Sequence, residues 1–92
     1  MRIVLTERFQ SDIRSLPSAE RDRVLEAMLA IPKALGDAHA HLGLGLRKIH
    51  RTGIREARVG LNLRLILTLV EGSTTFVRVG SHDEVKRFLR DL

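Results

Sequence analysis

The spacing of apolar residues changes once along this chain, from about 3.6 residues to strict alternation, and this change constrains the fold most. Four alternating runs fill the second half, with short connections at Arg51–Gly53, Leu61–Asn62 and Glu71–Ser73. Alternation is typical of strands that bury one face, and short polar connections favour hairpins. The pattern predicts an antiparallel meander of four strands, over Leu44–His50, Ile54–Gly60, Leu63–Val70 and Thr74–Val79.

Helical spacing dominates the first half. After a short apolar run, Arg2–Leu5, Thr6 is placed to cap a helix. Pro17 ends that helix, Ser18 is the expected cap of a second one, and Pro32 is expected to end or kink the second helix. Residues 36–43 are expected to form a loop. The apolar stripes of the two helices are Phe9, Ile13 and Leu16, and Val24, Leu25, Met28, Leu29 and Ile31. A strand followed by an antiparallel helical hairpin is therefore predicted.

A short helix is expected at the end of the chain. Ser81 and Glu84 have the S-x-x-E spacing of a capping box, and an apolar stripe follows from Val85 to Leu92. The predicted order is β-α-α-β-β-β-β-α, which is an α+β fold with an antiparallel sheet and the helical hairpin packed on one face. At 92 residues, the chain is expected to form one domain, residues 1–92.

Strand alternation also assigns side chains to faces of the sheet. The face that should meet the helices carries Leu63, Leu65, Leu67 and Leu69. The opposite, open face is predicted to carry Glu56, Arg58, Arg64, Thr68 and Arg78, with Ile66 and Phe76 among them.

Positive charge is concentrated on this predicted sheet. Residues 1–46 contain six Lys or Arg and six Asp or Glu, whereas residues 47–92 contain ten and five, so the second half carries the whole net charge of +5. A basic face suits a polyanion. With three Phe, no Tyr and no Trp, binding would depend on Arg and Lys rather than on stacking. A solvated face, or a groove for an acidic partner helix, remains an alternative.

Location and cofactors are constrained by what the sequence lacks. No apolar run approaches the roughly 20 residues that span a bilayer, and the N-terminus turns polar too early for a signal peptide, so a cytoplasmic protein without membrane contact is expected. Cysteine is absent, which excludes disulfides and thiolate metal sites. No cofactor and no metal are expected, although His39-x-His41 has a spacing found in metal sites.

His82 is the main candidate for proton transfer. It is expected at the first position of the last helix, where unpaired backbone N–H groups favour a phosphate. Two interpretations fit it: a general acid or base acting on RNA, or a residue that merely occupies a helix start. His41 is a candidate for a second titrating group, and solvated loop histidines are the alternative. Ser81 is explained as a cap, so no Ser-His-Asp triad is supported.

Three segments resemble the RelE/ParE superfamily of bacterial toxins from type II toxin–antitoxin systems. They are Gly45–Ile49, Ile54–Gly60 together with Arg64, and Val79–Val85. The resemblance implies a toxin that cuts mRNA on the ribosome without metal, by activating a 2′-hydroxyl against the adjacent phosphate. It also implies a cognate antitoxin as partner.

Site residues follow from the resemblance one by one. His82 looks like the histidine of the YafQ-like C-terminal motif, His41 like the histidine before the sheet, and Arg58 stands where a further histidine occurs. Arg64 resembles an arginine of RelE-like members. The implied roles are acid or base for His82 and His41, and charge stabilisation for Arg58 and Arg64. The expected RNA-binding set is Arg47, Lys48, Arg55, Arg78 and Lys86.

Departures from the family pattern keep two other functions open. Ile54 and Glu56 replace lysines of RelE-like toxins, Lys86 replaces an aromatic residue, and Asn62 replaces an acid of YafQ-like members. These changes favour either a ParE-like inhibitor of DNA gyrase without nuclease activity, or an inactive toxin fold that binds a partner.

Overall fold

The computed structural model describes residues 2–34, 47–49, 53–70 and 72–92. In chain order the elements are β1 (Arg2–Leu5), α1 (Glu7–Arg14), α2 (Ser18–Ala34), β2 (Arg47–Lys48), β3 (Ile54–Val59), β4 (Leu63–Val70), β5 (Ser73–Ser81) and α4 (His82–Arg90). This order confirms the predicted α+β arrangement. The predicted strand Leu44–His50 is limited to Arg47–Lys48 within the described residues, and the expected loop at residues 36–43 lies outside them.

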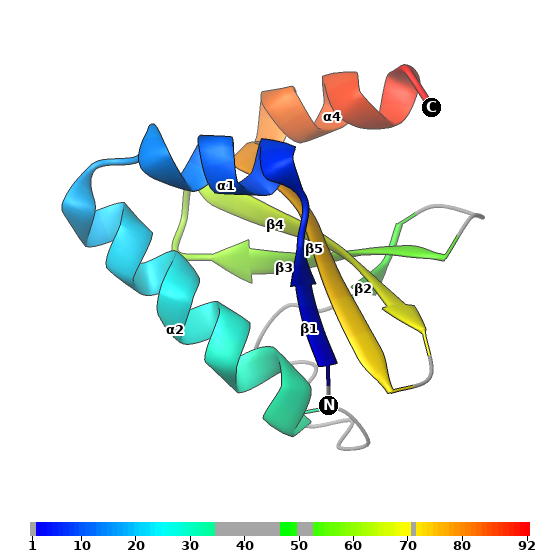
Figure 1. Ribbon diagram of the computed structural model, residues 1–92. Helices are drawn as coiled ribbons and strands as arrows, with labels where there is room; N and C mark the ends of the chain where they lie inside the picture. The colour runs from blue at the N-terminus through cyan, green and yellow to red at the C-terminus, as the bar shows by residue number, and fades with distance from the viewer. Residues whose placement is uncertain (1, 35–46, 50–52, 71) are drawn as a thin grey trace.

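The five strands form one mixed sheet in the order β1-β5-β4-β3-β2 (Figure 1). The antiparallel meander from β2 to β5 is confirmed. The predicted antiparallel sheet needs one correction, because β1 pairs with β5 in parallel, from Arg2 opposite Ser73 to Leu5 opposite Phe76. The chain leaves β1 through two helices and re-enters the sheet at the far edge, so β5 returns beside β1 in the same direction.

The main core lies between the sheet and the helices α1 and α2. Phe9, Val24 and Ile31 are fully buried there against Leu65 and Leu67 of β4. Each such side chain contributes about 1.5–3 kcal/mol when it is removed from water. The predicted packing of the helical hairpin on the leucine face is therefore confirmed.

Local capping explains where the first helices begin. Thr6 caps α1, since its side-chain oxygen accepts a hydrogen bond of 3.0 Å from the Phe9 backbone N–H. α2 begins at Ser18 itself, and Arg21 N donates to Pro17 O at 2.9 Å, so the expected cap was placed one residue too late. The helix continues through Pro32 to Ala34, because proline keeps a helical φ and removes only one backbone donor near the helix end.

A bulge in β5 changes which of its side chains lie on each face of the sheet, compared with the prediction from sequence. Ile66 pairs with Arg78 and Leu67 pairs with Phe76, so Val77 is left without a partner. The extra residue moves Phe76 to the helical-hairpin side, where its ring stacks on Phe9 with centroids 5.6 Å apart. Val77 instead packs on the other side. The prediction that Phe76 lies on the open face is wrong.

The face opposite the hairpin is partly covered, which also differs from the open face expected from sequence. α4 places Val85, with Phe88 and Leu89 beside it, on Ile54 of β3 and Ile66 of β4. Figure 1 shows α4 following directly from the end of β5. This second, smaller core fixes α4 above the basic strands. Within the described residues, no helix has the length and hydropathy that a membrane span requires.

Candidate nucleic-acid site

A cavity of about 320 Å³ opens where α4 passes over β2 and β3. Its lining within the described residues combines four basic or titratable side chains with one acidic and three apolar ones. They are Arg47, Lys48, His82 and Lys86, then Glu56, and Ile49, Val85 and Leu89. Three of the predicted RNA-binding residues therefore share a cavity with the predicted catalytic histidine.

His82 is positioned by the start of α4. The Ser81 side-chain oxygen accepts from Glu84 N at 3.2 Å, and Ser81 N donates to Glu84 Oε1 at 3.0 Å, which confirms the predicted capping box. His82 is the first helical residue and is exposed. The hydrogen bond from the Ser81 backbone N–H, followed by the one with the Ser81 side chain, lowers the pKa of Glu84.

Gly80 allows this tight start to form. A Cβ atom at Gly80 would lie 3.2 Å from Cβ of Glu84 and 3.3 Å from its Oε1. The Glu84 side chain therefore crosses directly over the Gly80 backbone, and with a larger residue there it would have to shift by a few tenths of an ångström. Gly80 and the Ser81 cap thus let α4 begin directly at the end of β5, with His82 as its first residue.

Glu56 forms ion pairs with two arginines at the cavity. Its side chain is 5% exposed, and its Oε1 atom lies 3.5 Å from both Arg47 Nη2 and Arg64 Nε. Arg64 also donates from Nη1 to Leu63 O at 3.1 Å. A buried carboxylate is costly unless it is paired, so these two arginines offset the cost of burying Glu56.

Arg58 and Arg64 stand directly opposite each other in the pairing of β3 with β4. Arg64 is partly buried and Arg58 is exposed. Like charges at directly paired positions repel, and an anion bound between them would relieve this repulsion. The two predicted charge-stabilising residues are therefore together, although neither lines the His82 cavity itself.

Other predicted site residues lie elsewhere or have a different role. Arg55 pairs with Leu67, which belongs to the main core, so Arg55 lies on the hairpin face of the sheet. Arg78 donates from Nε to Asp12 Oδ2 at 2.8 Å and from Nη2 to Oδ1 at 3.3 Å, so its guanidinium holds α1 against β5. His41 lies outside the described residues.

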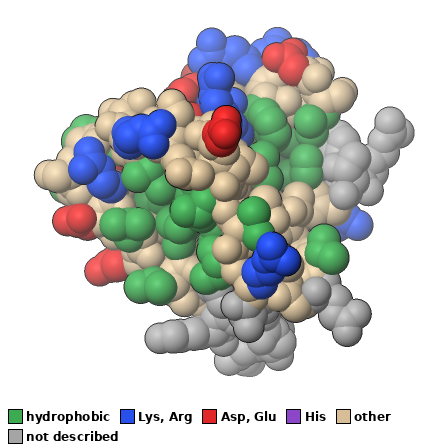
Figure 2. Space-filling model, viewed as in Figure 1, with side chains coloured by type: hydrophobic (Ala, Val, Ile, Leu, Met, Phe, Trp, Pro, Cys, Tyr) green, Lys and Arg blue, Asp and Glu red, His purple; other side chains and the backbone are tan. Residues whose placement is uncertain are grey.

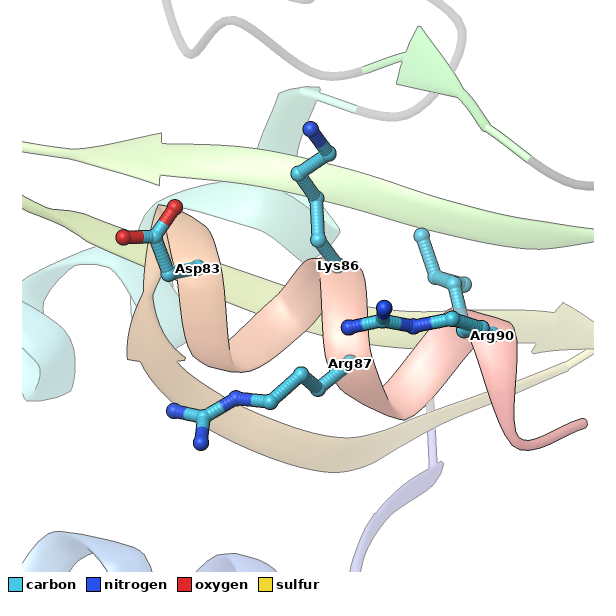
Figure 3. A pocket seen from close by; sticks show the side chains of 5 residues that line it. Asp83, Lys86, Arg87 and Arg90 are labelled. Atoms are coloured by element: carbon cyan, nitrogen blue, oxygen red, sulfur yellow. The ribbon is translucent and has the colours of Figure 1, made fainter.

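The outer face of α4 is basic as well. Asp83, Lys86, Arg87 and Arg90 line a second hollow of about 770 Å³ together with Leu89. Figure 3 shows the Lys86 side chain pointing away from that of Arg87, and Lys86 borders both hollows. Lys86 therefore joins the His82 cavity to the basic surface of α4.

The site combines side chains of the types that bind a phosphate with one that can transfer a proton. Cationic side chains around a helix N-terminus favour an anion, and an imidazole is the side chain that most often transfers protons in catalysis. Among the described residues, no three His, Asp or Glu side chains are grouped so as to hold a metal ion. Sequence reasoning missed Glu56 as part of the site, and its position as the lone acid among six cations within residues 47–64 was the available signal.

Comparison with known proteins identifies the fold. No family model matches the chain, and no curated protein sequence matches it. Among solved structures, YafQ from E. coli superposes with a TM-score of 0.75 at 18% identity, over 92% of this chain and 98% of YafQ. A chain of the E. coli DinJ–YafQ toxin–antitoxin complex gives 0.73 at 17% identity, over 90% and 93% of the two chains.

A third similar structure is the RelB–RelE antitoxin–toxin complex from Methanococcus jannaschii. It gives a TM-score of 0.68 at 21% identity, over 92% of this chain and 96% of the other. The match extends along nearly the whole of each chain, so it covers the sheet, the hairpin and the C-terminal helix together. The chain therefore has the RelE/YafQ-like toxin fold that its sequence motifs predicted.

Proposed function

We propose that this protein is the toxin of a type II toxin–antitoxin system and cleaves mRNA on the ribosome, without metal, in the cytoplasm. The observation that carries the proposal is the cavity in which His82 lies beside Arg47, Lys48 and Lys86. A titratable group surrounded by cations is what cleavage of a phosphodiester requires. The fold shared with the toxins of the DinJ–YafQ and RelB–RelE complexes supports the toxin part of the proposal.

In the proposed reaction, the ribose 2′-oxygen attacks the adjacent phosphorus atom. A base removes the 2′-hydroxyl proton, the bond from phosphorus to the 5′-oxygen breaks, and an acid protonates that oxygen, which leaves a 2′,3′-cyclic phosphate and a 5′-hydroxyl. His82 acts as one of these two groups, and His41 is proposed as its partner. Arg58 and Arg64 stabilise the charge that develops on the phosphate.

A cognate antitoxin is proposed as the second partner. The DinJ–YafQ and RelB–RelE structures are complexes of a toxin with an antitoxin. In this chain, Leu25 and Leu29 of α2 are 44% and 66% exposed, and Ile3 and Leu5 of β1 are also exposed on the hairpin side. Figure 2 shows hydrophobic side chains over α2 and between α2 and β1. An amphipathic antitoxin segment would cover such a surface.

The test is cleavage of a reporter mRNA during translation in vitro, with cut sites mapped by primer extension. Wild-type protein is compared with His82→Ala and with Arg14→Ala, an exposed residue of α1 on the far side of β5 from the cavity. We expect cuts that need ribosomes, survive Arg14→Ala and are reduced by His82→Ala about 100-fold or more, within the range for loss of an acid–base group.

Either alternative function would give a different result. Cutting that is unchanged in a folded His82→Ala variant would remove His82 from the reaction. If the folded wild-type protein makes no cuts, the nuclease proposal fails, and a DNA gyrase supercoiling assay then separates a ParE-like inhibitor from an inactive partner-binding protein.

A further inference from the structure

Glu56 is the only acidic side chain among the described residues that line the His82 cavity. It lies in the middle of β3 and is 4% exposed as a residue, on the face that α4 covers. Burial of a carboxylate in a site that otherwise attracts anions costs free energy and also weakens anion binding. We therefore expect Glu56 to have a role that offsets its burial cost and its effect on anion binding.

Contacts of Glu56 show what it does to the neighbouring arginines. One oxygen, Oε1, is shared between Arg47 from β2 and Arg64 from β4, each at 3.5 Å. Arg64 is thus held at two points, by Glu56 at Nε and by Leu63 O at Nη1. Neither of these contacts uses its third nitrogen, Nη2, so Glu56 and Leu63 do not prevent Nη2 from binding an incoming phosphate.

Charge repulsion gives a second reason for a carboxylate at this position. Arg58 and Arg64 are directly paired across β3 and β4, and Glu56 precedes Arg58 by two residues on the same face. The negative charge of Glu56 therefore keeps Arg64 from turning away from Arg58 into solvent. Without it, three arginines would lie close together with no internal anion between them.

We propose that Glu56 is a positioning residue, whose carboxylate holds Arg64 and Arg47 in place beside the His82 cavity for RNA cleavage. This inference rests on the proposed nuclease function. Glu56 opposes phosphate binding by its own charge, yet orients the guanidinium groups that stabilise the transition state. Its removal is therefore expected to change binding and catalysis in opposite directions.

The experiment compares Glu56→Gln with Glu26→Gln, which makes the same charge change at an exposed position on α2. Affinity is measured by fluorescence anisotropy with a labelled single-stranded RNA, and the cleavage rate by single turnover on programmed ribosomes with saturating protein. For Glu56→Gln we expect RNA to bind about two- to fivefold more tightly and to be cut about tenfold or more slowly. Glu26→Gln should change neither quantity beyond about twofold.

If the role of Glu56 were purely structural, Glu56→Gln would lower stability in urea without making RNA binding tighter and cleavage slower. An unchanged single-turnover rate in folded Glu56→Gln would overturn the proposal, and so would an equal effect in Glu26→Gln. If Glu56→Gln does not fold, Arg64→Lys replaces it, because lysine keeps the charge and loses the planar donors. Slower cutting without tighter RNA binding is then expected, and an unchanged rate overturns the proposal.

Positioning can also be read without any nuclease activity. The side-chain Nε–H signal of Arg64 is followed by NMR in wild type and in Glu56→Gln, with inorganic phosphate as the titrant. We expect the signal to shift and to exchange faster with water in Glu56→Gln before phosphate is added. An unchanged Arg64 signal would overturn the positioning role even if the protein cuts RNA, and a changed signal would support it even if the nuclease proposal fails.

Discussion

Substitution of Asp12 by alanine should lower stability more than any other change of an exposed or partly exposed charge in the described chain. The Asp12 carboxylate accepts two hydrogen bonds from Arg78, at 2.8 and 3.3 Å, and one from Val79 N at 3.1 Å. Thr6 assists it nearby, since its Oγ1 donates to Val77 O at 2.8 Å. Together these groups replace the strand pairing that β5 lacks beyond the end of β1.

The magnitude follows from the burial of the pair. Side chains of Asp12 and Arg78 are 13% and 20% exposed, so the pair is less costly to break than a fully buried one, for which about 3–5 kcal/mol is lost. After Asp12→Ala, Arg78 can reach water, but Val79 N–H loses its acceptor, at about 1–3 kcal/mol. We expect a loss of about 2–3 kcal/mol, which corresponds to a fall in Tm of roughly 10–20 °C for a domain of this size.

Thermal and urea unfolding of Asp12→Ala, Arg78→Ala and the double variant measure this loss as a double-mutant cycle. We expect a coupling of about 1–2 kcal/mol between the two residues. Asp22→Ala, at an exposed position of α2, is the control and should stay within about 0.5 kcal/mol of wild type. If Asp12→Ala costs no more than the control, or the coupling is absent, this account of the α1–β5 contact is wrong.

Three further outcomes are expected. Phe76→Ala should cost about 3–5 kcal/mol in urea unfolding, whereas Val77→Ala, on the smaller core, should cost about 1 kcal/mol; the reverse order would contradict the bulge. The pKa of Glu84 is lowered on folding, so the difference in unfolding free energy between wild type and Glu84→Gln should be largest above about pH 4.5 and decrease as pH drops through the folded pKa. A difference that does not vary from pH 7 to 3 would refute this pH dependence. Arg58→Ala should reduce mRNA cleavage about 100-fold with unfolding within about 0.5 kcal/mol of wild type, and equal cleavage would exclude Arg58 from the site.

Patterns within a few residues predicted the helices and most strands well. Thr6 and Ser81 mark the start of α1 and α4 because their side chains accept a hydrogen bond from the backbone N–H three residues ahead. The spacing from Ser81 to Glu84 can be recognised from the sequence alone. Leu63, Leu65 and Leu67 identify the buried face of β4 for the same local reason, since strand side chains alternate.

Features that depend on pairing between distant segments were not predicted. The bulge at Val77 inserts one residue without a glycine or any other local mark, so alternation placed Phe76 on the wrong face. Parallel pairing of β1 with β5 is set by the route of the chain through α1 and α2, which periodicity does not encode. Coverage of the second face by α4 follows from the apolar contact of Val85 with Ile66, two residues whose meeting the sequence does not reveal.

Charge is the clearest case in which tertiary contacts decide what a sequence signal means. Counting cations gave a basic sheet suited to a polyanion, yet a cation contributes to phosphate binding only to the extent that no carboxylate of the protein already holds it. Arg78 is held by Asp12, 66 residues away in the chain, and Arg47 and Arg64 share Glu56. Among the described cations of the candidate site, Arg58, Lys48 and Lys86 form no ion pair. Under the proposed function, these three are therefore expected to contribute most to RNA binding, and Arg64 to the cleavage step.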